Sequence, residues 1–298
     1  MIPPTRALAD LEETEVLGLL DASLEVELRE LARASRAAVF RDLPDVSWAV
    51  GAVPGASVYR TRLTPADASD RIAELSAALE IFGPVTWWAG PTATPTDLRD
   101  RLVDAGYRLE DDEAGMAADL RELVEDIPRP AGLVIRAVER GDGTLDEDAL
   151  EGWLEVNRRT LGWPSEKVGR RRDLYRGDER HPRPWRHHVG LLDGAPVSAS
   201  RVLLSHGVGM VHGVSTVPEA RRRGLGTALT LSALQAARTL GYRIGILQAS
   251  SLGQGPYRRL GFRAFAAYGR FMREPAVADA PADRERAGES PANEERAA

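Results

Sequence analysis

The segment best suited to chemistry is a glycine-containing turn that joins a predicted strand to a predicted amphipathic helix. Its sequence is Val217-Pro218-Glu219-Ala220-Arg221-Arg222-Arg223-Gly224-Leu225-Gly226-Thr227. The first N–H groups of a helix lack intrahelical partners, and the helix dipole adds roughly half a positive charge there. Gly224 and Gly226 leave these amides uncovered, and Thr227 adds a hydroxyl. The turn therefore predicts a phosphate-binding site, with an exposed turn that binds nothing as the alternative.

The elements that must position this turn lie in the second half of the chain. Three strand patterns are broken by Asp193-Gly194 and His206-Gly207, which predicts antiparallel pairing. An arginine-rich segment over residues 162–186 shows only weak patterning. We predict strands at 133–137, 188–192, 197–204, 209–217, 242–248 and 262–272, and helices at 145–161, 226–240 and 255–260.

The first half has its own strand and helix patterns. Leucines and alanines at helical spacing predict two helices within residues 6–40. We predict a hairpin of strands 47–53 and 57–63 around Pro54-Gly55, further strands at 85–89, 107–112 and 115–120, and helices at 67–82 and from 94 or 96 to 105.

Composition and charge limit the possible classes of protein. With 298 residues the chain is long enough for two domains, and the absence of cysteine excludes disulfides and thiolate metal sites. A net charge of −6 argues against general nucleic-acid binding. No apolar run has the length of a membrane span or signal peptide, so we expect a cytoplasmic protein that does not bind membranes.

Histidines and arginines cluster before the three strands. His181, His187 and His188 lack a metal-ligand spacing, so we predict no metal. Residues 170–172 and Arg176 are interpreted as a solvated basic face, with the pocket of an acidic acceptor as the alternative.

Two motifs together resemble the GCN5-related N-acetyltransferase (GNAT) superfamily. Arg221, Gly224 and Gly226 fit its pyrophosphate-loop pattern Q/R-x-x-G-x-G/A, and Tyr257-Arg258-Arg259-Leu260-Gly261-Phe262 fits its Y-x-x-L-G-F segment at a normal distance downstream. The resemblance covers about residues 133–273. It implies an α+β fold with a mostly antiparallel central sheet, splayed fourth and fifth strands, and flanking helices.

The resemblance also implies the cofactor contacts. Acetyl-CoA would enter between the splayed strands, with the backbone of Ser215, Thr216 and Val217 pairing with the pantetheine arm. The turn from Arg221 through Arg222, Arg223, Gly224, Leu225 and Gly226 to Thr227 would hold the pyrophosphate, and Ser250 lies at the strand-5 exit.

Catalytic roles follow from the chemistry of acyl transfer. By its match to the family tyrosine, Tyr257 is the predicted general acid for the departing thiolate, with a packing role as the alternative. A backbone N–H of Val217 or Thr216 would polarise the thioester carbonyl. His212 is a candidate base on the strand before the turn, although a structural histidine, a water chain or an acceptor already neutral remain alternatives. No acidic residue occurs between Arg201 and Pro218.

A faint repeat predicts that the fold is duplicated. Leu102-Val103-Asp104-Ala105-Gly106-Tyr107-Arg108 resembles Arg258-Arg259-Leu260-Gly261-Phe262-Arg263, and aligning the glycines sets Leu102 against Tyr257. The equivalent first-half loop, residues 61–67, has no glycine and places Asp67 at the helix start. We therefore expect a GNAT-like half that has lost its chemistry at residues 1–125, a catalytic domain at 126–274 and a disordered tail at 275–298.

The predicted function is an acetyl-CoA-dependent N-acetyltransferase, of class EC 2.3.1, acting as a monomer or homodimer. Its acceptor would be a primary amine of a small molecule or peptide, which attacks directly in a ternary complex. The alternative is a non-catalytic regulator that binds acyl-CoA.

Overall fold

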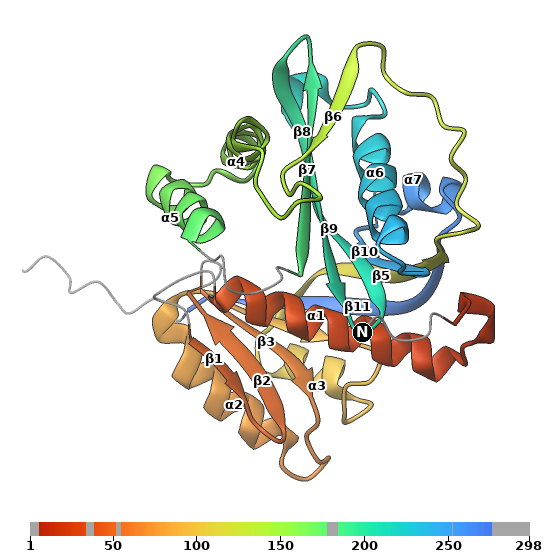
Figure 1. Ribbon diagram of the computed structural model, residues 1–298. Coiled ribbons are helices and arrows are strands. Elements are labelled where there is room, and N and C mark those ends of the chain that lie inside the picture. Colours follow the sequence, from red (N-terminus) through yellow and green to blue (C-terminus); the bar gives the residue numbers. More distant parts are fainter. Residues whose placement is uncertain (1–5, 34–38, 52–54, 178–183, 252, 276–298) are drawn as a thin grey trace, which may run out of the picture.

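A computed structural model describes residues 6–33, 39–51, 55–177, 184–251 and 253–275. Within these residues one sheet of eleven strands crosses the molecule in the order β1-β2-β3-β4-β11-β5-β10-β9-β8-β7-β6 (Figure 1). All neighbouring pairs are antiparallel except β3 with β4 and β9 with β10. The strands are β1 (Val39–Asp42), β2 (Val46–Val50), β3 (Ala56–Thr61), β4 (Val85–Ala89), β5 (Arg108–Asp119), β6 (Leu133–Ala137), β7 (Trp185–Leu192), β8 (Ala195–Ser205), β9 (Val208–Thr216), β10 (Ile244–Ala249) and β11 (Arg263–Arg273).

Helices cover this sheet in groups that belong to the two halves of the chain, here residues up to 125 and from 126 onward. Helices α2 and α3 flank the strands of the first half, whereas α4 and α5 lie away from α6 and α7 in the second (Figure 1). The described helices are α1 (Glu13–Arg33), α2 (Ala68–Leu79), α3 (Leu98–Asp104), α4 (Glu147–Leu161), α5 (Ser165–Gly177), α6 (Leu225–Thr239), α7 (Gln254–Arg259) and the 3-10 turns Leu8–Asp10, Glu80–Phe82 and Pro218–Ala220.

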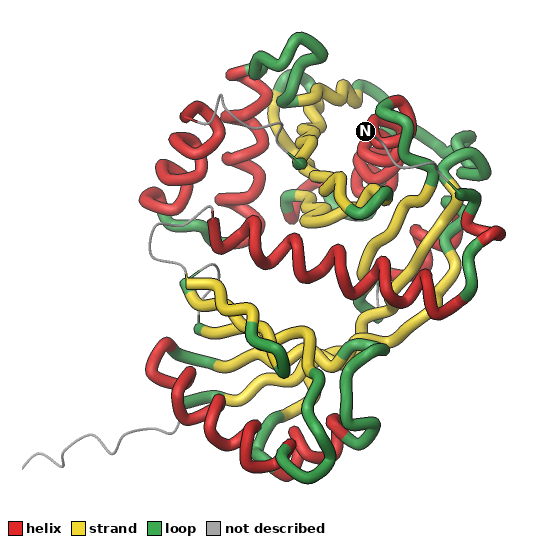
Figure 2. Tube along the Cα trace, turned by 60° about the horizontal axis from the view of Figure 1, so that its bottom comes forward, coloured by secondary structure: helices red, strands yellow, loops and turns green. Residues whose placement is uncertain are grey.

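The long helix α1 lies between the two halves in both ribbon views (Figures 1 and 2). It contacts β1, β2 and β3 of the first half and also β8 and β11 of the second. Val16, Leu20 and Leu24 recur at helical spacing on one buried stripe, which packs in a core with Tyr59 and Met210. Burial of this stripe joins the halves through one shared hydrophobic core.

The two halves also exchange strands. The last strand of the first half, β5, pairs with β10 and β11 of the second half. In turn β11, the last strand of the second half, pairs with β4. The predicted boundary between domains 1–125 and 126–274 stays a prediction, because both segments build one continuous sheet.

The repeat detected in the sequence has a matching backbone geometry. Gly106 and Gly261 both have positive φ, +84° and +104°, directly after the short helices α3 and α7. The N–H of Tyr107 donates to the carbonyl of Leu102 at 2.9 Å, and that of Phe262 donates to Tyr257 at 3.1 Å. Leu102 and Tyr257 are therefore equivalent positions in the two halves.

Most predicted elements are confirmed within a few residues, including the α+β class and the mostly antiparallel sheet. Two expectations were wrong, and one helix was not predicted. Residues 13–33 form one helix, and the predicted strand pair at 107–112 and 115–120 is the single strand β5. The weakly patterned segment contains α5, whose inward face is partly cationic. The predicted disordered tail lies outside the described residues apart from Pro275.

Candidate functional site

The site begins where two parallel strands separate. β9 and β10 pair from Val208 opposite Ile244 to Val211 opposite Leu247, and their described pairing stops there. Further along, β9 stays on β8 but passes an irregularity at Gly213, whose φ of +57° favours glycine. The strands therefore open on the side that faces the start of α6.

The turn into α6 lines this opening, and two of its residues have left-handed backbone. Arg222 has φ +61° and Gly224, the residue before the helix, has φ +80°. Both help turn the chain so that the first amides of α6 face outward. A cavity of about 380 Å³, here called the α6 cavity, is lined there by Val214, Thr216, Ala220, Arg221, Arg222, Gly224, Leu225, Gly226, Thr227, Gly253, Pro256, Tyr257 and Arg259.

Most of the predicted cofactor contacts line this cavity, but four do not. Ser215, Val217 and Arg223 do not line the cavity, and the Val217 N–H already donates to the Val197 carbonyl at 3.0 Å. Of the two amides considered for carbonyl polarisation, only that of Thr216 remains available. Ser250 lies in the adjoining cavity instead.

Sequence reasoning missed Arg259 in the lining of the α6 cavity. The signal was the arginine pair directly after Tyr257. The guanidinium of Arg259 lies 3.6 Å from where a side chain on Gly255 would start, in the first turn of α7, and the residue lines the same cavity as the start of α6.

A second cavity of about 480 Å³, here called the central cavity, adjoins the first and shares Val214, Gly253 and Tyr257 with it. Both halves build this cavity. Its lining is Leu24, Glu27, Ser57, Thr86, Trp88, Glu113, Val211, His212, Gly213, Val214, Gln248, Ala249, Ser250, Gly253, Tyr257 and Arg270.

Tyr257 stands at the junction of the two cavities. Its ring packs edge-on against Phe262 with centroids 6.2 Å apart. Burial raises the pKa of the phenol above its usual range, and the Thr230 hydroxyl partly opposes this shift. The tyrosine therefore keeps its proton at neutral pH and can donate it.

His212 and Glu27 form a pair across the halves. Glu27 comes from α1, is 3% exposed, and accepts from His212 Nε2. The carboxylate also pairs with Arg201 on β8 at 3.3 Å. The pair fixes the proton of His212 on Nε2, which leaves Nδ1 with a lone pair.

A second carboxylate of the first half, Glu113 on β5, also lines the central cavity. Its nearest cation is Arg270, with the Nε and Oε1 atoms 3.5 Å apart. Burial raises the pKa of Glu113 above its ordinary value. Sequence reasoning missed both Glu27 and Glu113, because it searched for a carboxylate only on the strand that carries His212.

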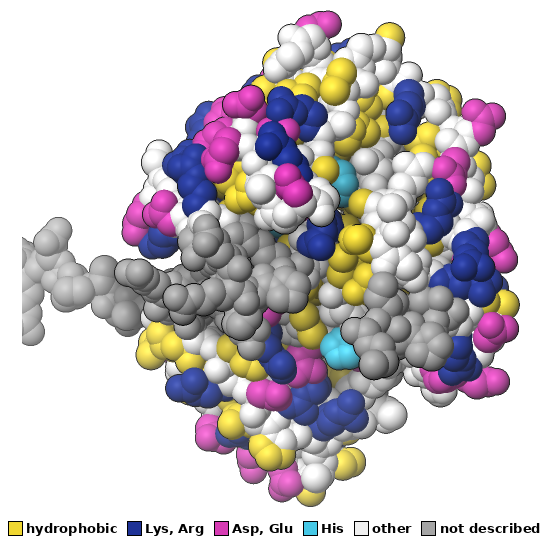
Figure 3. Space-filling view, viewed as in Figure 1, with side chains coloured by type: hydrophobic (Ala, Val, Ile, Leu, Met, Phe, Trp, Pro, Cys, Tyr) yellow, Lys and Arg dark blue, Asp and Glu magenta, His cyan; other side chains and the backbone are white. Residues whose placement is uncertain are grey.

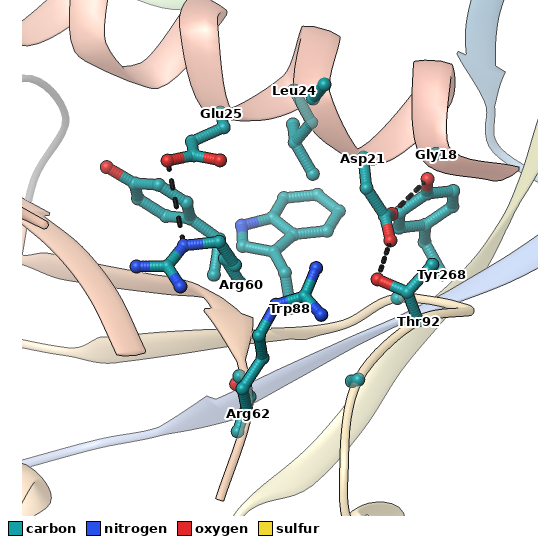
Figure 4. A pocket seen from close by; sticks show the side chains of 14 residues that line it. Gly18, Asp21, Leu24, Glu25, Arg60, Arg62, Trp88, Thr92 and Tyr268 are labelled. Carbon is teal, nitrogen blue, oxygen red and sulfur yellow. Dashed lines mark hydrogen bonds and ion pairs between the residues drawn. The ribbon is translucent and has the colours of Figure 1, made fainter. Parts of the chain in front are cut away.

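The first half has an equivalent opening with a different interior. β3 and β4 pair in parallel up to Val58 opposite Trp87, and Arg60 then has φ +45°. The cavity there is only about 130 Å³. From α1, Asp21 accepts from Thr92 and Tyr268, and Glu25 faces Arg60 (Figure 4). Side chains of α1 thus lie against this opening, and no residue from the start of α2 lines the cavity.

Two absences apply to the described residues only. No group of histidine, aspartate or glutamate side chains there has the arrangement of a metal site. None of the helices described is long and apolar enough to cross a membrane. His181 lies outside the described residues.

Comparisons with known proteins agree with this geometry. Residues 150–262 match the model of the acetyltransferase (GNAT) family. A curated mycothiol acetyltransferase from Actinosynnema mirum is 32% identical over an alignment of 207 residues, and the match covers 65% of this chain and 65% of that protein's length.

Solved structures extend the likeness over both halves. A GCN5-related N-acetyltransferase from Kribbella flavida has a TM-score of 0.56 at 21% identity, covering 86% of this chain and 96% of its own. A tandem GNAT protein from the clavulanic acid biosynthesis pathway has a TM-score of 0.55 at 16% identity, covering 92% and 98%. Together these comparisons support the GCN5-related N-acetyltransferase superfamily for this chain, and the solved structures share its fold over both halves.

Proposed function

We propose that the protein is an acetyl-CoA-dependent N-acetyltransferase that transfers an acetyl group to a primary amine by direct attack. The observation that carries this proposal is the meeting of the α6 cavity and the central cavity at Tyr257, with His212 and Glu27 on the central side. The superfamily and the curated acetyltransferase relative support the same activity.

The α6 cavity fits the diphosphate of acetyl-CoA. The amides at the start of α6 are its donors, and Arg221, Arg222 and Arg259 add positive charge. A side chain at Gly226 would begin 3.5 Å from Val214, which places it in the space that a ligand needs. Acetyl-CoA supplies the activated acetyl group, so the protein needs to orient it and to move protons.

The base must remove a proton from the attacking amine. An alkylammonium costs about 4–5 kcal/mol to deprotonate at pH 7. His212 Nδ1 takes this proton, and Glu27 stabilises the resulting imidazolium through Nε2. The Thr216 N–H polarises the thioester carbonyl as the C–N bond forms and the C–S bond breaks.

The departing thiolate takes its proton from Tyr257. Burial raises the pKa of this phenol, so the side chain is protonated before the reaction. The second proton of the amine, lost as the amide forms, returns the tyrosinate to tyrosine, and the imidazolium of His212 releases the first proton to solvent. Proton and charge thus balance over one turnover, and no covalent enzyme intermediate is needed.

A non-catalytic acyl-CoA sensor is the second candidate. The first half has lost its phosphate site, because residues 61–67 contain no glycine. A protein that has lost one site in this way could also have lost catalysis and kept only acyl-CoA binding. The polar groups of the central cavity favour the enzyme, since a sensor has no need of a paired histidine beside the thioester.

The deciding experiment mixes the protein with acetyl-CoA and a broad panel of primary amines and follows thiol release. We expect release that depends on both substrates. Calorimetric binding of acetyl-CoA without turnover on any amine would support the sensor, and the absence of binding would refute both proposals. We also propose a cytoplasmic location and a monomer or homodimer.

A further inference from the structure

The arginine-rich helix α5 turns one arginine inward. Three of its arginines form solvent-facing ion pairs: Arg170 with Glu166, Arg172 with Glu151, and Arg176 with Glu147. Arg171 is instead only 7% exposed. No described carboxylate lies within ion-pair distance of it, and its hydrogen-bonding partner is the neutral Tyr175. The solvated-face interpretation therefore fits three of the four arginines and fails for Arg171.

Two further cations surround Arg171, and together we call Lys167, Arg171 and Arg201 the cation cluster. Lys167 and Arg171 lie over the Trp163 ring, 5.0 Å and 5.6 Å from its centroid. Arg201 lies 4.5 Å from the centroid of Trp185. Burial lowers the pKa of both Lys167 and Arg171, and repulsion from Arg201 lowers them further.

The carboxylates beside the cation cluster do not balance its charge. Glu27 pairs with Arg201, but it also accepts from His212. Glu139 is engaged by His187 at 2.6 Å, and His187 reaches Arg171 only through Tyr175. Of these two carboxylates only Glu27 pairs with a cation of the cluster, so Lys167 and Arg171 have no carboxylate partner among the described residues. A buried cation without an anion is unfavourable, and an anionic ligand would relieve it.

Arg201 links the cation cluster to the central cavity through its neighbours, and none of the three cations is itself part of the cavity lining. Arg201 on β8 stands opposite His212 on β9. Its Nε is buried without a hydrogen-bond partner and lies 3.6 Å from where a side chain on Gly213 would start. Gly213 and Glu27 both line the central cavity. In Figure 1, α1 crosses in front of the lower ends of these strands and α5 lies to their left, and Figure 3 shows Lys or Arg side chains in the hollow between the upper and lower parts.

We propose that the cation cluster binds a carboxylate of the acceptor, so that the acceptor is an amine that also carries a carboxylate. This inference rests on the proposed function, since it names the acceptor of the same site. The planar forks of Arg171 and Arg201 match a carboxylate, and Lys167 adds a third charge. The amine would then lie toward His212, with the carboxylate on the side away from the α6 cavity.

Binding without catalysis tests the carboxylate site by itself. Calorimetry compares glutarate with its neutral diamide, glutaramide, on the wild type and on Lys167→Met, Arg171→Met and Arg170→Met. We expect glutarate to bind and glutaramide not to bind. The affinity for glutarate should fall roughly 10- to 100-fold in the first two variants. Arg170→Met, on the solvent side of the same helix, should leave the affinity nearly unchanged.

Kinetics add a readout that a purely structural role would not change. Amino acids and their carboxamides of equal length serve as paired acceptors. In Lys167→Met the KM for the carboxylate form should rise, while kcat and the KM for the carboxamide stay near wild type. Lys167 is half-buried, so this variant keeps the test valid if Arg171→Met does not fold.

Equal binding of glutarate and glutaramide, or the same loss in Arg170→Met, would overturn the inference. So would equal KM changes for both acceptor forms. If no amine releases thiol but glutarate binding depends on the cluster, the proposed function fails while the anion site stands.

Discussion

At the residue scale, Tyr257 is the group whose role is simplest to isolate. Replacement by Phe keeps the ring that packs on Phe262 and removes only the hydroxyl. We expect Tyr257→Phe to lower kcat by about 100-fold or more, because the thiolate then leaves unprotonated. The dissociation constant of acetyl-CoA, measured by calorimetry, should stay close to wild type. Undiminished turnover would remove the tyrosine from the mechanism.

Glu27 acts through His212, so its replacement should lower the rate of acetyl transfer without weakening the binding of acetyl-CoA. In Glu27→Gln the imidazolium loses its charge partner, and we expect kcat/KM to fall by at least roughly tenfold. The dissociation constant of acetyl-CoA should stay close to wild type, because Glu27 lines the central cavity and not the α6 cavity. Glu25→Gln, on the same helix but facing Arg60, is the matched control. Equal values of kcat/KM in the two variants would contradict the pairing.

Glu113 should affect stability in a way that depends on pH. Burial raises its pKa in the folded protein, so the native state holds this proton more tightly than the unfolded chain. Ionisation therefore costs stability as the pH rises above the ordinary value of 4.5. We expect Glu113→Gln to gain in thermal midpoint over the wild type from pH 5 to pH 8. The exposed Glu110→Gln on the same strand should show no such trend, and a constant offset for Glu113→Gln would disprove the argument.

Site residues could be predicted from sequence only where a local pattern marks them. Gly224 and Tyr257 stand in short motifs whose spacing is visible along the chain. Glu27 and Glu113 have no such signal, because their proximity to His212 depends on packing between distant segments. His212 was predicted, but its partner was not.

At the element scale, the start of α6 carries the prediction for cofactor binding. Gly224→Glu places a carboxylate beside the amides that would bind the diphosphate, and we expect acetyl-CoA binding to fall below detection in calorimetry. The left-handed φ of +80° also strains any side chain there. Asparagine tolerates that conformation, so Gly224→Asn separates strain from charge and should retain much of the binding.

A charge control for this element is available on a distant loop. Gly141 is exposed and has open space around it, and Gly141→Glu adds the same charge without touching α6. It should bind acetyl-CoA like the wild type. If Gly224→Glu also binds normally, the phosphate-site assignment is wrong.

Helices and strands were predicted correctly where hydrophobic residues recur at regular spacing. They were missed where charged residues interrupt that spacing. The strand at Val85–Ala89 and the helix α6 follow their sequence patterns closely. Helix α5 was missed because its inward face includes Arg171, a residue that a hydrophobic pattern assigns to solvent. The pattern thus fails at the cation cluster. The proposed binding of an acceptor carboxylate there would account for the buried charge.

At the scale of the whole molecule, the continuous sheet could not be read from local sequence. The repeat predicts two similar halves, but not that β5 inserts between β10 and β11. Pairing between distant strands cannot be predicted from the sequence pattern. Side chains alternate between the two faces of the sheet in the same way whichever strand is the neighbour. The exchange explains why the central cavity takes its wall from both halves.

The exchange predicts that neither half folds properly alone. A fragment of residues 126–298 lacks β5, so β10 would present an open edge and α1 would no longer cover the core around Met210. We expect this fragment to aggregate or to melt without a cooperative transition. Co-expression with residues 1–125 should restore a soluble complex that acetyl-CoA protects against heat. A separately expressed 126–298 fragment that melts cooperatively at the full-length temperature would show that the second half does not need the strand it receives.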